Sequence, residues 1–239
     1  NGEPIQTFAR ERRVQLAYEE YPPQLINAFL AAEDRTFFEH GGIDIPGIIS
    51  AMFTNLTTSG RPVGASTITQ QVAKNLLLTN EVTYTRKIRE LFLARRIEAT
   101  LSKEQILELY LNQIFLGRNA YGVQAAARAY FDKDIDQLAL HEVAFLAALP
   151  RAPSNYDPVR RTERATERRN WVLDQMARND FITAAQRAEA ERQPLGTVRG
   201  TGDSFRNVGG YFMEEVRRTL IDRYGETADA GPNSVYAGG

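Results

Sequence analysis

Apolar side chains recur every three or four residues along most of this chain, which is the spacing of one face of an α-helix. Prolines, capping boxes of the Ser/Thr-x-x-Gln type and glycines mark the ends of several of these segments. The pattern therefore predicts a mainly α fold. The helices that we expect cover 22–33, a segment from about 46 to 56, one that begins after Thr67, 85–99, one from Ser102 to Gly117, 138–149, 163–177, 183–191 and 208–225.

Strand-like patterns occur only near the two ends of the chain. Residues 5–8 and 14–16 could pair as a hairpin, and 234–236 could begin a strand that the end of the chain interrupts. A glycine-containing stretch at 196–202 is typical of a linker. We therefore expect short β segments at the termini of a helical protein. The expected organisation is an N-terminal β segment over 1–20, a helical domain over 21–195, and a linker with the start of a following domain over 196–239.

The composition is that of an ordinary globular protein. The chain has 239 residues, of which 43% are hydrophobic and 25% charged, and its formal net charge is −1. Bulk charge therefore gives no reason to expect nucleic acid as a partner. The segment 61–103 is different, because it holds eight basic residues against three acidic ones and could suit a phosphate-bearing ligand. The absence of cysteine excludes a disulfide framework and thiolate metal sites.

No segment of the sequence has the run of about 18 apolar residues that a membrane-spanning helix needs. The chain begins at Asn1 and not at a methionine, so we expect a processed or trimmed protein. The lack of an anchor segment is therefore no argument against a membrane protein.

Glu33 breaks the apolar pattern of its helix. At 100° per residue it lies in the same stripe as Ile26, Phe29 and Leu30. A carboxylate there is costly to desolvate, so it either has structural partners or gains a raised pKa, and the helix pattern alone favours neither. His40 taken alone is typical of a structural histidine. The residues that follow favour a cleft, because polar groups crowd the exit of the helix. These residues are Asp34, Phe37, His40, Gly41 and Gly42.

Two further segments combine polar and basic side chains. Residues 64–74 place a glycine-containing loop ahead of a helix N-terminus, with Lys74 one or two turns along, and this arrangement can hold phosphate oxygens. In the next segment, Arg86 and Lys87 each share a helix face with Glu90, which taken alone is typical of a surface ion pair. Each pattern is weak by itself. The polar face expected on the first helix carries Thr67, Gln70, Gln71 and Lys74, opposite Ile68, Val72 and Leu76.

Taken together and in order, five segments resemble the motifs of the peptidoglycan glycosyltransferases, the lysozyme-like module of class A penicillin-binding proteins. The resemblance covers about residues 22–190. One departure is Val82, which stands where many members of the family carry a basic residue. The matching segments are 33–42 (E-D-x-x-F-x-x-H-x-G), 64–71 (G-x-S-T-x-T-Q-Q), 86–90 (R-K-x-x-E), 103–112 (K-x-x-I-L-x-x-Y-L-N) and 168–173 (R-x-x-x-V-L).

The resemblance implies an inverting glycosyltransferase with a two-lobed helical domain, consisting of a head and a membrane-facing jaw. Enzymes of this family polymerise lipid II into β-1,4-linked glycan strands, release undecaprenyl pyrophosphate and are targets of moenomycin. The expected partners are lipid II, the growing lipid-linked strand, the membrane surface and other proteins of cell-wall synthesis. The expected location is the outer face of the bacterial inner membrane, with an N-terminal anchor outside this chain and a transpeptidase domain after it.

By the same resemblance, Glu33 and Glu90 are the expected catalytic residues. Glu33 would remove the proton from the 4-hydroxyl of the acceptor. Glu90 would hold cations near the leaving pyrophosphate or help to bind a divalent ion, magnesium or manganese, although the sequence assigns no definite metal ligands. We expect Arg168 and Arg169 to pack within the protein rather than to touch substrate. The expected substrate-binding residues are Asp34, Phe37, His40, Ser66, Thr67, Gln70, Gln71, Lys74, Arg86, Lys87 and Asn112.

Two other functions stay open on the sequence. A lysozyme-like peptidoglycan hydrolase would also carry one acidic residue at this place, although the basic cluster beside the glycine loop argues against it. A catalytically silent cell-wall scaffold is disfavoured by the intact candidates for base and phosphate contacts. The apolar helix that begins near Pro46 is equally open, because it can be the membrane-facing jaw or a buried core helix.

Overall fold

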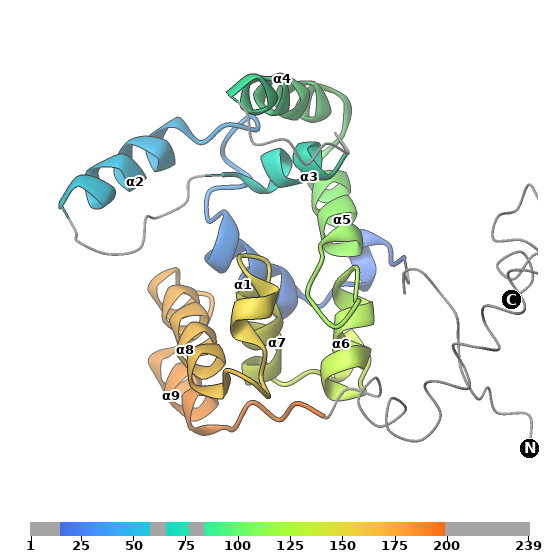
Figure 1. Ribbon diagram of the computed structural model, residues 1–239, viewed down its shortest axis with the longest axis vertical. Helices are drawn as coiled ribbons and strands as arrows, with labels where there is room; N and C mark the ends of the chain where they lie inside the picture. Colours follow the sequence, from blue (N-terminus) through green and yellow to red (C-terminus); the bar gives the residue numbers. More distant parts are fainter. Residues whose placement is uncertain (1–14, 58–65, 77–83, 199–239) are drawn as a thin grey trace, which may run out of the picture.

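The computed structural model describes residues 15–57, 66–76 and 84–198, and over these ranges the protein is built from α-helices and short 3-10 turns (Figure 1). This confirms the mainly α class predicted from the sequence. Within the described ranges the one β-type pairing is an isolated bridge between Phe115 and Tyr121. The helices are α1 (Pro23–Glu33), α2 (Ile45–Thr57), α3 (Ile68–Leu76), α4 (Tyr84–Thr100), α5 (Lys103–Gln113), α6 (Val123–Phe131), α7 (Leu140–Ala148), α8 (Thr162–Arg178) and α9 (Ala184–Arg192), and the turns are η1 (Tyr18–Glu20), η2 (Ile135–Gln137) and η3 (Pro153–Tyr156).

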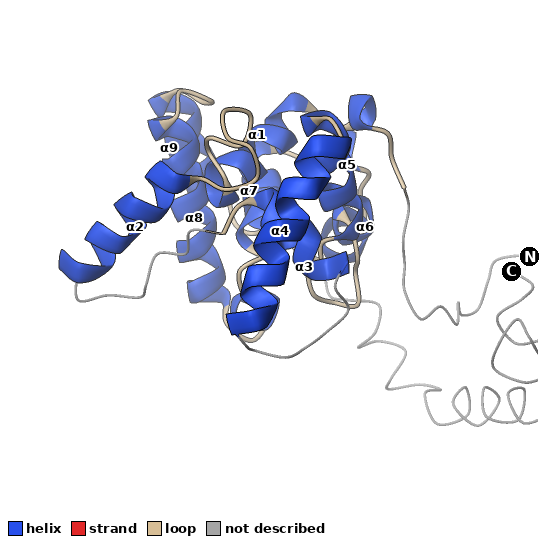
Figure 2. Ribbon diagram, turned by 90° about the horizontal axis from the view of Figure 1, so that it is seen from above, coloured by secondary structure: helices blue, strands red, loops and turns tan. Residues whose placement is uncertain are grey.

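The helices form two packed groups that α6 joins. In one group α1 packs on α7 and α8, and α8 holds α9; in the other, α3 packs on α4 and α5. Because α6 contacts both α5 and α7, it connects the two groups (Figures 1 and 2). At the centre of the first group α7 is apolar on every side from Val143 to Ala148, and these residues are all buried. α2 extends away from both groups and has no extensive contact with another described helix.

Helix boundaries follow the capping chemistry in most places. α5 begins at a capping box in which Ser102 Oγ accepts from Gln105 N at 3.3 Å and Gln105 Oε1 accepts from Ser102 N at 2.9 Å. The prediction that Gly117 ends this helix is wrong, because α5 ends at Gln113. Ile114 already has extended backbone geometry, with ψ at 131°, so the helix stops one turn before the glycine.

The helix α6 has no counterpart in the sequence prediction. It is nine residues long and follows Gly122, which supplies no side-chain cap, so neither length nor a capping box marks it in the sequence. Gly122 precedes it with a φ of +84°, and a Cβ at this position would lie 2.6 Å from the carbonyl oxygen of Asn112. Only glycine therefore lets α6 begin this close to α5. Seven of the nine residues of α6 are buried, as expected of a helix that links the two groups.

The N-terminal part of the described chain is attached to α5 through an amide side chain. Asn112 Oδ1 accepts from Leu16 N at 3.0 Å and from Tyr21 Oη at 2.9 Å, while Asn112 Nδ2 donates to the Leu16 carbonyl at 2.8 Å. The side chain thus pairs with the backbone as a neighbouring strand would, but Gln15 and Leu16 form no strand. The remaining terminal predictions, the strands at 5–8 and 234–236 and the helix at 208–225, lie outside the described residues.

Arg169 fastens the end of α9 from the inside. Its side chain lies on α8 and is 1% exposed. The Nη1 and Nη2 groups each donate to the Gln193 carbonyl at 3.0 Å, and Nη2 also donates to the Glu191 carbonyl at 3.2 Å. A helix C-terminus leaves its last carbonyls without intrahelical partners, and this guanidinium supplies the missing donors. Arg169 therefore has the packing role expected from the sequence.

Replacement of Arg169 by methionine should lower the free energy of unfolding by about 2–4 kcal/mol, because buried carbonyls lose their charged donors. Urea denaturation followed by circular dichroism measures this loss. Arg178→Met is the matched control, because Arg178 lies on the same helix with a side chain that is 71% exposed. Its surface pair with Asp174 should be worth less than about 1 kcal/mol. Equal losses in the two variants would contradict a buried clamp at Arg169.

Candidate active site

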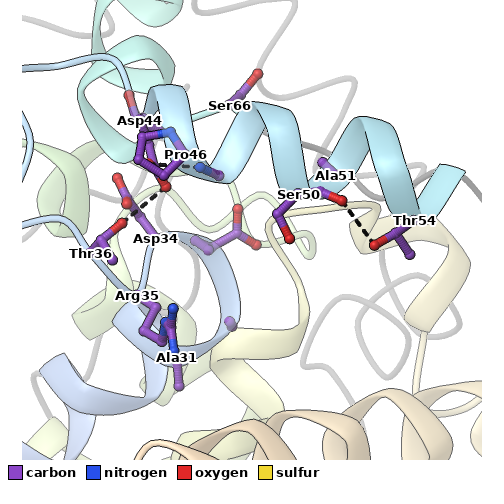
Figure 3. A pocket seen from close by; sticks show the side chains of 14 residues that line it. Ala31, Asp34, Arg35, Thr36, Asp44, Pro46, Ser50, Ala51, Thr54 and Ser66 are labelled. Carbon is purple, nitrogen blue, oxygen red and sulfur yellow. Dashed lines mark hydrogen bonds between the residues drawn. The ribbon is translucent and has the colours of Figure 1, made fainter.

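A pocket of about 390 Å³ lies between the C-terminal end of α1 and the helix α2 (Figure 3). Its floor comes from the last turn of α1 and the residues directly after it, and α2 forms the opposite wall. The residues just before α3 close one side. The polar groups that line it are Glu33, Asp34, Arg35, Thr36, Asp44, Ser50, Thr54, Ser66 and Thr67.

Asp34 is fixed by donors from two directions. Its side chain is buried, and its carboxylate accepts from His40 Nε2 at 2.9 Å and from the backbone N–H of Ile68 at 2.9 Å. Gly42 N–H donates to His40 Nδ1 at 3.2 Å, so the imidazole carries its proton on Nε2. Ile68 is the first residue of α3, and a carboxylate is favoured at a helix N-terminus. That first amide is therefore already occupied, and phosphate contacts near α3 must use other donors.

The turn after α1 is locked against α3 and α5. The Gly42 carbonyl accepts from Thr67 Oγ1 at 2.8 Å and from Gln70 Nε2 at 3.4 Å. Thr67 Oγ1 also accepts from Gln70 N at 3.2 Å, which is one half of the expected capping box at the start of α3. The side chain of Gln70, which would form the other half, points to the Gly42 carbonyl. Lys103 Nζ donates to the His40 carbonyl at 2.6 Å and to Glu98 Oε1 at 2.8 Å. The first, second and fourth motifs thus form one rigid frame behind the pocket.

Glu33 is the carboxylate that this frame leaves accessible. It is partly buried and accepts from Gln71 Nε2 at 2.8 Å. Burial raises the pKa of Glu33, and the nearby charge of Asp34 adds to this. The hydrogen bond from Gln71 and the charges of Arg168 and Arg151 oppose the rise in the Glu33 pKa. The side chain therefore sits where its ionised form is poorly solvated but still supported by a donor and two cations.

The other two carboxylates of the pocket, Asp34 and Asp44, each accept a hydrogen bond from a backbone N–H. Asp44 Oδ1 accepts from Gly47 N at 2.9 Å, and Asp44 Oδ2 accepts from Thr36 Oγ1 at 3.0 Å (Figure 3). Asp34 is held as described above. Glu33 accepts a single hydrogen bond within the described structure, so among the three it keeps the most oxygen lone pairs to receive a proton. Gly47 gives the first turn of α2 room for this arrangement, because a Cβ there would lie 2.1 Å from Asp44 Oδ2.

A basic side chain lies on the far side of α3 from Glu33. Lys87 of α4 forms an ion pair with Glu90, and its Nζ lies 3.4 Å from Ser66 Oγ and 3.5 Å from Gln70 Oε1. Glu90 is only 3% exposed, whereas the side chain of Lys87 is 45% exposed. Because Gln70 reaches Lys87 and the adjacent Gln71 reaches Glu33, the first turn of α3 joins the carboxylate to the cation.

The remaining basic candidates lie on the same two helices. Lys74 is exposed in the last turn of α3, one turn beyond Gln70 and Gln71, and Arg86 is partly buried on α4. The expected opposition of polar and apolar faces on α3 is only partly correct. Thr67 and Gln70 are buried, and Leu76 is 49% exposed, because the polar face packs on the turn after α1.

Two residues predicted to bind substrate, Phe37 and Asn112, have partners within the protein. Phe37 is fully buried, with Lys103 Nζ 4.4 Å from its ring centroid. Asn112 is occupied by Leu16 and Tyr21. The sequence reasoning did not include several pocket residues from the turn and from α2, because no pattern in the chain says which polar residues of an exposed helix face a cavity. These residues are Thr36, Asp44, Ser50 and Thr54.

The described residues do not form a metal site around Glu90. Its carboxylate is paired with Lys87, and a lysine is a poor neighbour for a divalent cation. Within 15–57, 66–76 and 84–198, no group of three or more histidine, aspartate or glutamate side chains could hold a metal ion. The donor set around Glu90 therefore fits a cation-holding role and not a magnesium or manganese centre.

α2 turns its polar face inward and its apolar face outward, the reverse of the usual arrangement of a surface helix. Its small and polar face, with Gly47, Ser50, Ala51 and Thr54, lines the pocket. Its apolar stripe points outward with exposed fractions from 38% to 79%, so the buried-core alternative for this helix is excluded within the described structure. No helix in the part of the chain that the structure describes is long and apolar enough to cross a membrane. The outward stripe consists of Ile45, Ile48, Ile49, Met52, Phe53 and Leu56.

The chain matches one protein-family model, described as transglycosylase, over residues 1–177. This is well over half of the chain, and the protein belongs to the transglycosylase family. Its class is therefore that of the glycosyltransferases.

The relatives that this chain resembles are penicillin-binding proteins 1A. The chain is 45% identical to penicillin-binding protein 1A of Aquifex aeolicus over 96% of this chain and 31% of that protein. It is 43% identical to penicillin-binding protein 1A of Escherichia coli over 99% of this chain and 28% of that protein. A crystal structure of penicillin-binding protein 1A from Haemophilus influenzae matches with a TM-score of 0.56 and 29% identity, over 92% of this chain and 22% of that one. This likeness confirms the lysozyme-like fold class. The chain spans less than a third of these relatives.

Glu33→Gln should stabilise the fold at pH 7.5 by about 0.5–2 kcal/mol, the usual size of single stabilising substitutions. The pKa of Glu33 is raised by burial, so its ionisation opposes folding above the unfolded pKa near 4.5. Below that pH the carboxyl is protonated in both states, and the gain should shrink as the pH is lowered towards it. Urea denaturation at several pH values measures the difference.

The neighbouring Asp34 is the matched control for this prediction. Asp34→Asn should lower the free energy of unfolding, because the charged form is hydrogen-bonded by His40 and by the first amide of α3. Destabilisation of both variants at pH 7.5 would mean that Glu33 is a satisfied structural carboxylate.

Proposed function

We propose that this domain polymerises lipid II into β-1,4-linked peptidoglycan strands, with inversion at the anomeric carbon and release of undecaprenyl pyrophosphate. The observation that carries the proposal is the position of Glu33. It is a poorly solvated carboxylate at a pocket, held by one amide donor, with Lys87 on the other side of the first turn of α3. Membership of the transglycosylase family and likeness to penicillin-binding proteins 1A support the choice of substrate class.

The chemistry that we propose needs one base and one charged leaving group. Glu33 accepts the proton of the acceptor's 4-hydroxyl, and the oxygen attacks the anomeric carbon of the donor from the face opposite the pyrophosphate. The bond from that carbon to the phosphate oxygen breaks, and its electron pair leaves with the pyrophosphate. A glycosidase would need a second carboxyl group at the pocket as acid or nucleophile. Asp34 and Asp44 are both hydrogen-bonded to the backbone, which favours transfer over hydrolysis.

The departing pyrophosphate needs positive charge that is already in place. Lys87 is the best-placed candidate, because Glu90 and Gln70 fix its position and nearly half of its side chain is exposed. Arg86 on the same helix and Lys74 at the end of α3 would complete the cluster. Glu90 then acts through Lys87 and does not itself touch the substrate.

The outward stripe of α2 is the surface that we propose lies against the membrane. The helix carries no charged residue, and its exposed side chains repeat with the spacing of a single helix face. Because the opposite face lines the pocket, a lipid-linked sugar can reach Glu33 while its lipid stays in the bilayer. We propose, from the family resemblance, that this membrane is the bacterial inner membrane and that the domain lies at its outer surface.

Glu33→Gln should reduce polymerisation of labelled lipid II by about 10²–10⁴-fold, the usual contribution of a positioned general base. Gel analysis of glycan strands measures the product. Glu39→Gln is the control, because Glu39 is an exposed carboxylate in the turn after α1, and its activity should be unchanged. Near-normal polymerisation by Glu33→Gln would remove the base assignment. Release of sugar fragments from finished cell walls by the unaltered protein would favour the hydrolase alternative.

Lys87→Met should impair both turnover and stability, because it leaves Glu90 buried without its cation. The double variant Lys87→Met/Glu90→Gln should regain most of the lost melting temperature but no turnover. Thermal denaturation and the lipid II assay on the same samples separate the two effects. Arg95→Met, at an exposed arginine of α4, is the control and should behave as the unaltered protein. Recovery of turnover in the double variant would reduce Lys87 to a structural ion-pair partner.

A further inference from the structure

A second pocket of about 390 Å³ is lined by residues of α8 and by residues in and just before η3. We call it the arginine pocket and define it by Arg151, Tyr156, Arg164, Glu167, Arg168 and Trp171. Three of these side chains are cationic, and one is anionic. The charges of Arg151 and Arg168 both act on Glu33, so the pocket is an electrostatic neighbour of the proposed base. No step proposed above uses it.

Arg168 is held in this pocket without an anion. Its guanidinium stacks on Trp171, with Cζ 3.8 Å from the ring centroid. Its Nε is buried and has no hydrogen-bond partner among the residues that the structure describes. No carboxylate of the described chain forms a salt bridge with Arg168 or with Arg164. Burial is the main cause that lowers the pKa of Arg168.

The adjacent Arg169 gives the contrast. Its donors are used by the Glu191 and Gln193 carbonyls, and its side chain is enclosed. Arg169 thus has the expected packing role, whereas Arg168 packs on Trp171 and also borders a cavity. Arg168 is a partly desolvated cation at the edge of a cavity, with a buried Nε that has no hydrogen-bond partner among the described residues. Such a group is costly unless an anion completes it.

We propose that the arginine pocket binds an oxyanion of the sugar substrate that reacts at Glu33, and this rests on the proposed function. The fork of a guanidinium matches the two oxygens of a carboxylate or phosphate. Trp171 is 38% exposed and offers apolar surface beside this fork for the sugar or peptide that bears the anion. In a lipid-linked disaccharide the oxyanion can be a carboxylate of the attached peptide or a phosphate of the lipid linkage.

Binding at this pocket would also act on the base. Arg168 and Arg151 favour the ionised form of Glu33 and so oppose the rise of its pKa. An anion between them would offset their charges and raise the pKa of Glu33 further. A carboxylate with a higher pKa is a stronger proton acceptor once it is ionised. The pocket therefore couples the arrival of substrate to the basicity of Glu33.

Trp171 supplies a direct test, because it is the single tryptophan of the chain. Its fluorescence is followed in the whole protein while a phosphate-free disaccharide–pentapeptide or inorganic pyrophosphate is titrated. We expect a saturable change with at least one probe. A response to the disaccharide–pentapeptide alone assigns the oxyanion to the peptide carboxylates, and a response to pyrophosphate alone assigns it to the lipid linkage. A response to both supports the shared chemistry.

The variants test the residues. Arg168→Gln and Arg164→Gln should each weaken binding by about tenfold or more, as expected for loss of a charge-assisted hydrogen-bond pair. Arg164 is exposed, so that variant keeps the fold and the Arg168–Trp171 stack. Arg178→Gln, on the same helix outside the pocket, should bind normally. The proposal would be overturned if no probe gave a saturable response, or if binding were unchanged in both pocket variants. If the disaccharide–pentapeptide responds, equal binding of the same compound with its carboxylates amidated would also overturn it.

This experiment and the test of the proposed function fail separately. Fluorescence reports binding without turnover, whereas strand formation from lipid II reports turnover without regard to this pocket. If the protein polymerises lipid II but gives no fluorescence response, only the proposal of anion binding at the arginine pocket is contradicted. If it binds the probes but makes no strands, only the proposed reaction is contradicted.

Discussion

The site depends on two adjacent carboxylates at the end of α1, of which one is fully hydrogen-bonded and the other is not. Asp34 is buried and hydrogen-bonded by His40 and by the first amide of α3, so its charge is fully used to hold the frame together. Glu33 receives one hydrogen bond, from Gln71, and keeps the remaining lone pairs at the pocket. The satisfied carboxylate makes the frame rigid, and that rigidity is what holds the unsatisfied one in a poorly solvated position.

The sequence predicted the helices well where local chemistry defines them. The capping box at Ser102 and the proline at the start of α1 act within one turn, so they can be read without the fold. α6 was missed, because it is short and the glycine before it supplies no side-chain cap. The stop at Gly117 was misplaced for a different reason. The end of α5 is set by the turn that follows it and not by the nearest glycine.

For the site, the sequence indicated which residues belong together but not what each one touches. Glu33 stood out because a carboxylate interrupted an apolar stripe, and that is a local signal. The division of labour between Arg168 and Arg169 is not local, since it depends on the carbonyls of α9 and on Trp171. The direction of α2 is a similar case. A periodic pattern gives a helix an apolar face, but only the tertiary structure says that this face points outward.

The two cations proposed to bind substrate, Lys87 and Arg168, differ in how far their charges are compensated, and this suits two tasks. Lys87 is paired with Glu90, so part of its charge is already compensated, and an anion bound there is held less tightly. Arg168 has no salt-bridge partner in the described chain and a buried Nε without a hydrogen bond. A leaving group must be stabilised as it forms and then released, whereas the partner that remains must be retained. For the transfer proposed above, a compensated lysine fits the first requirement and an uncompensated arginine the second.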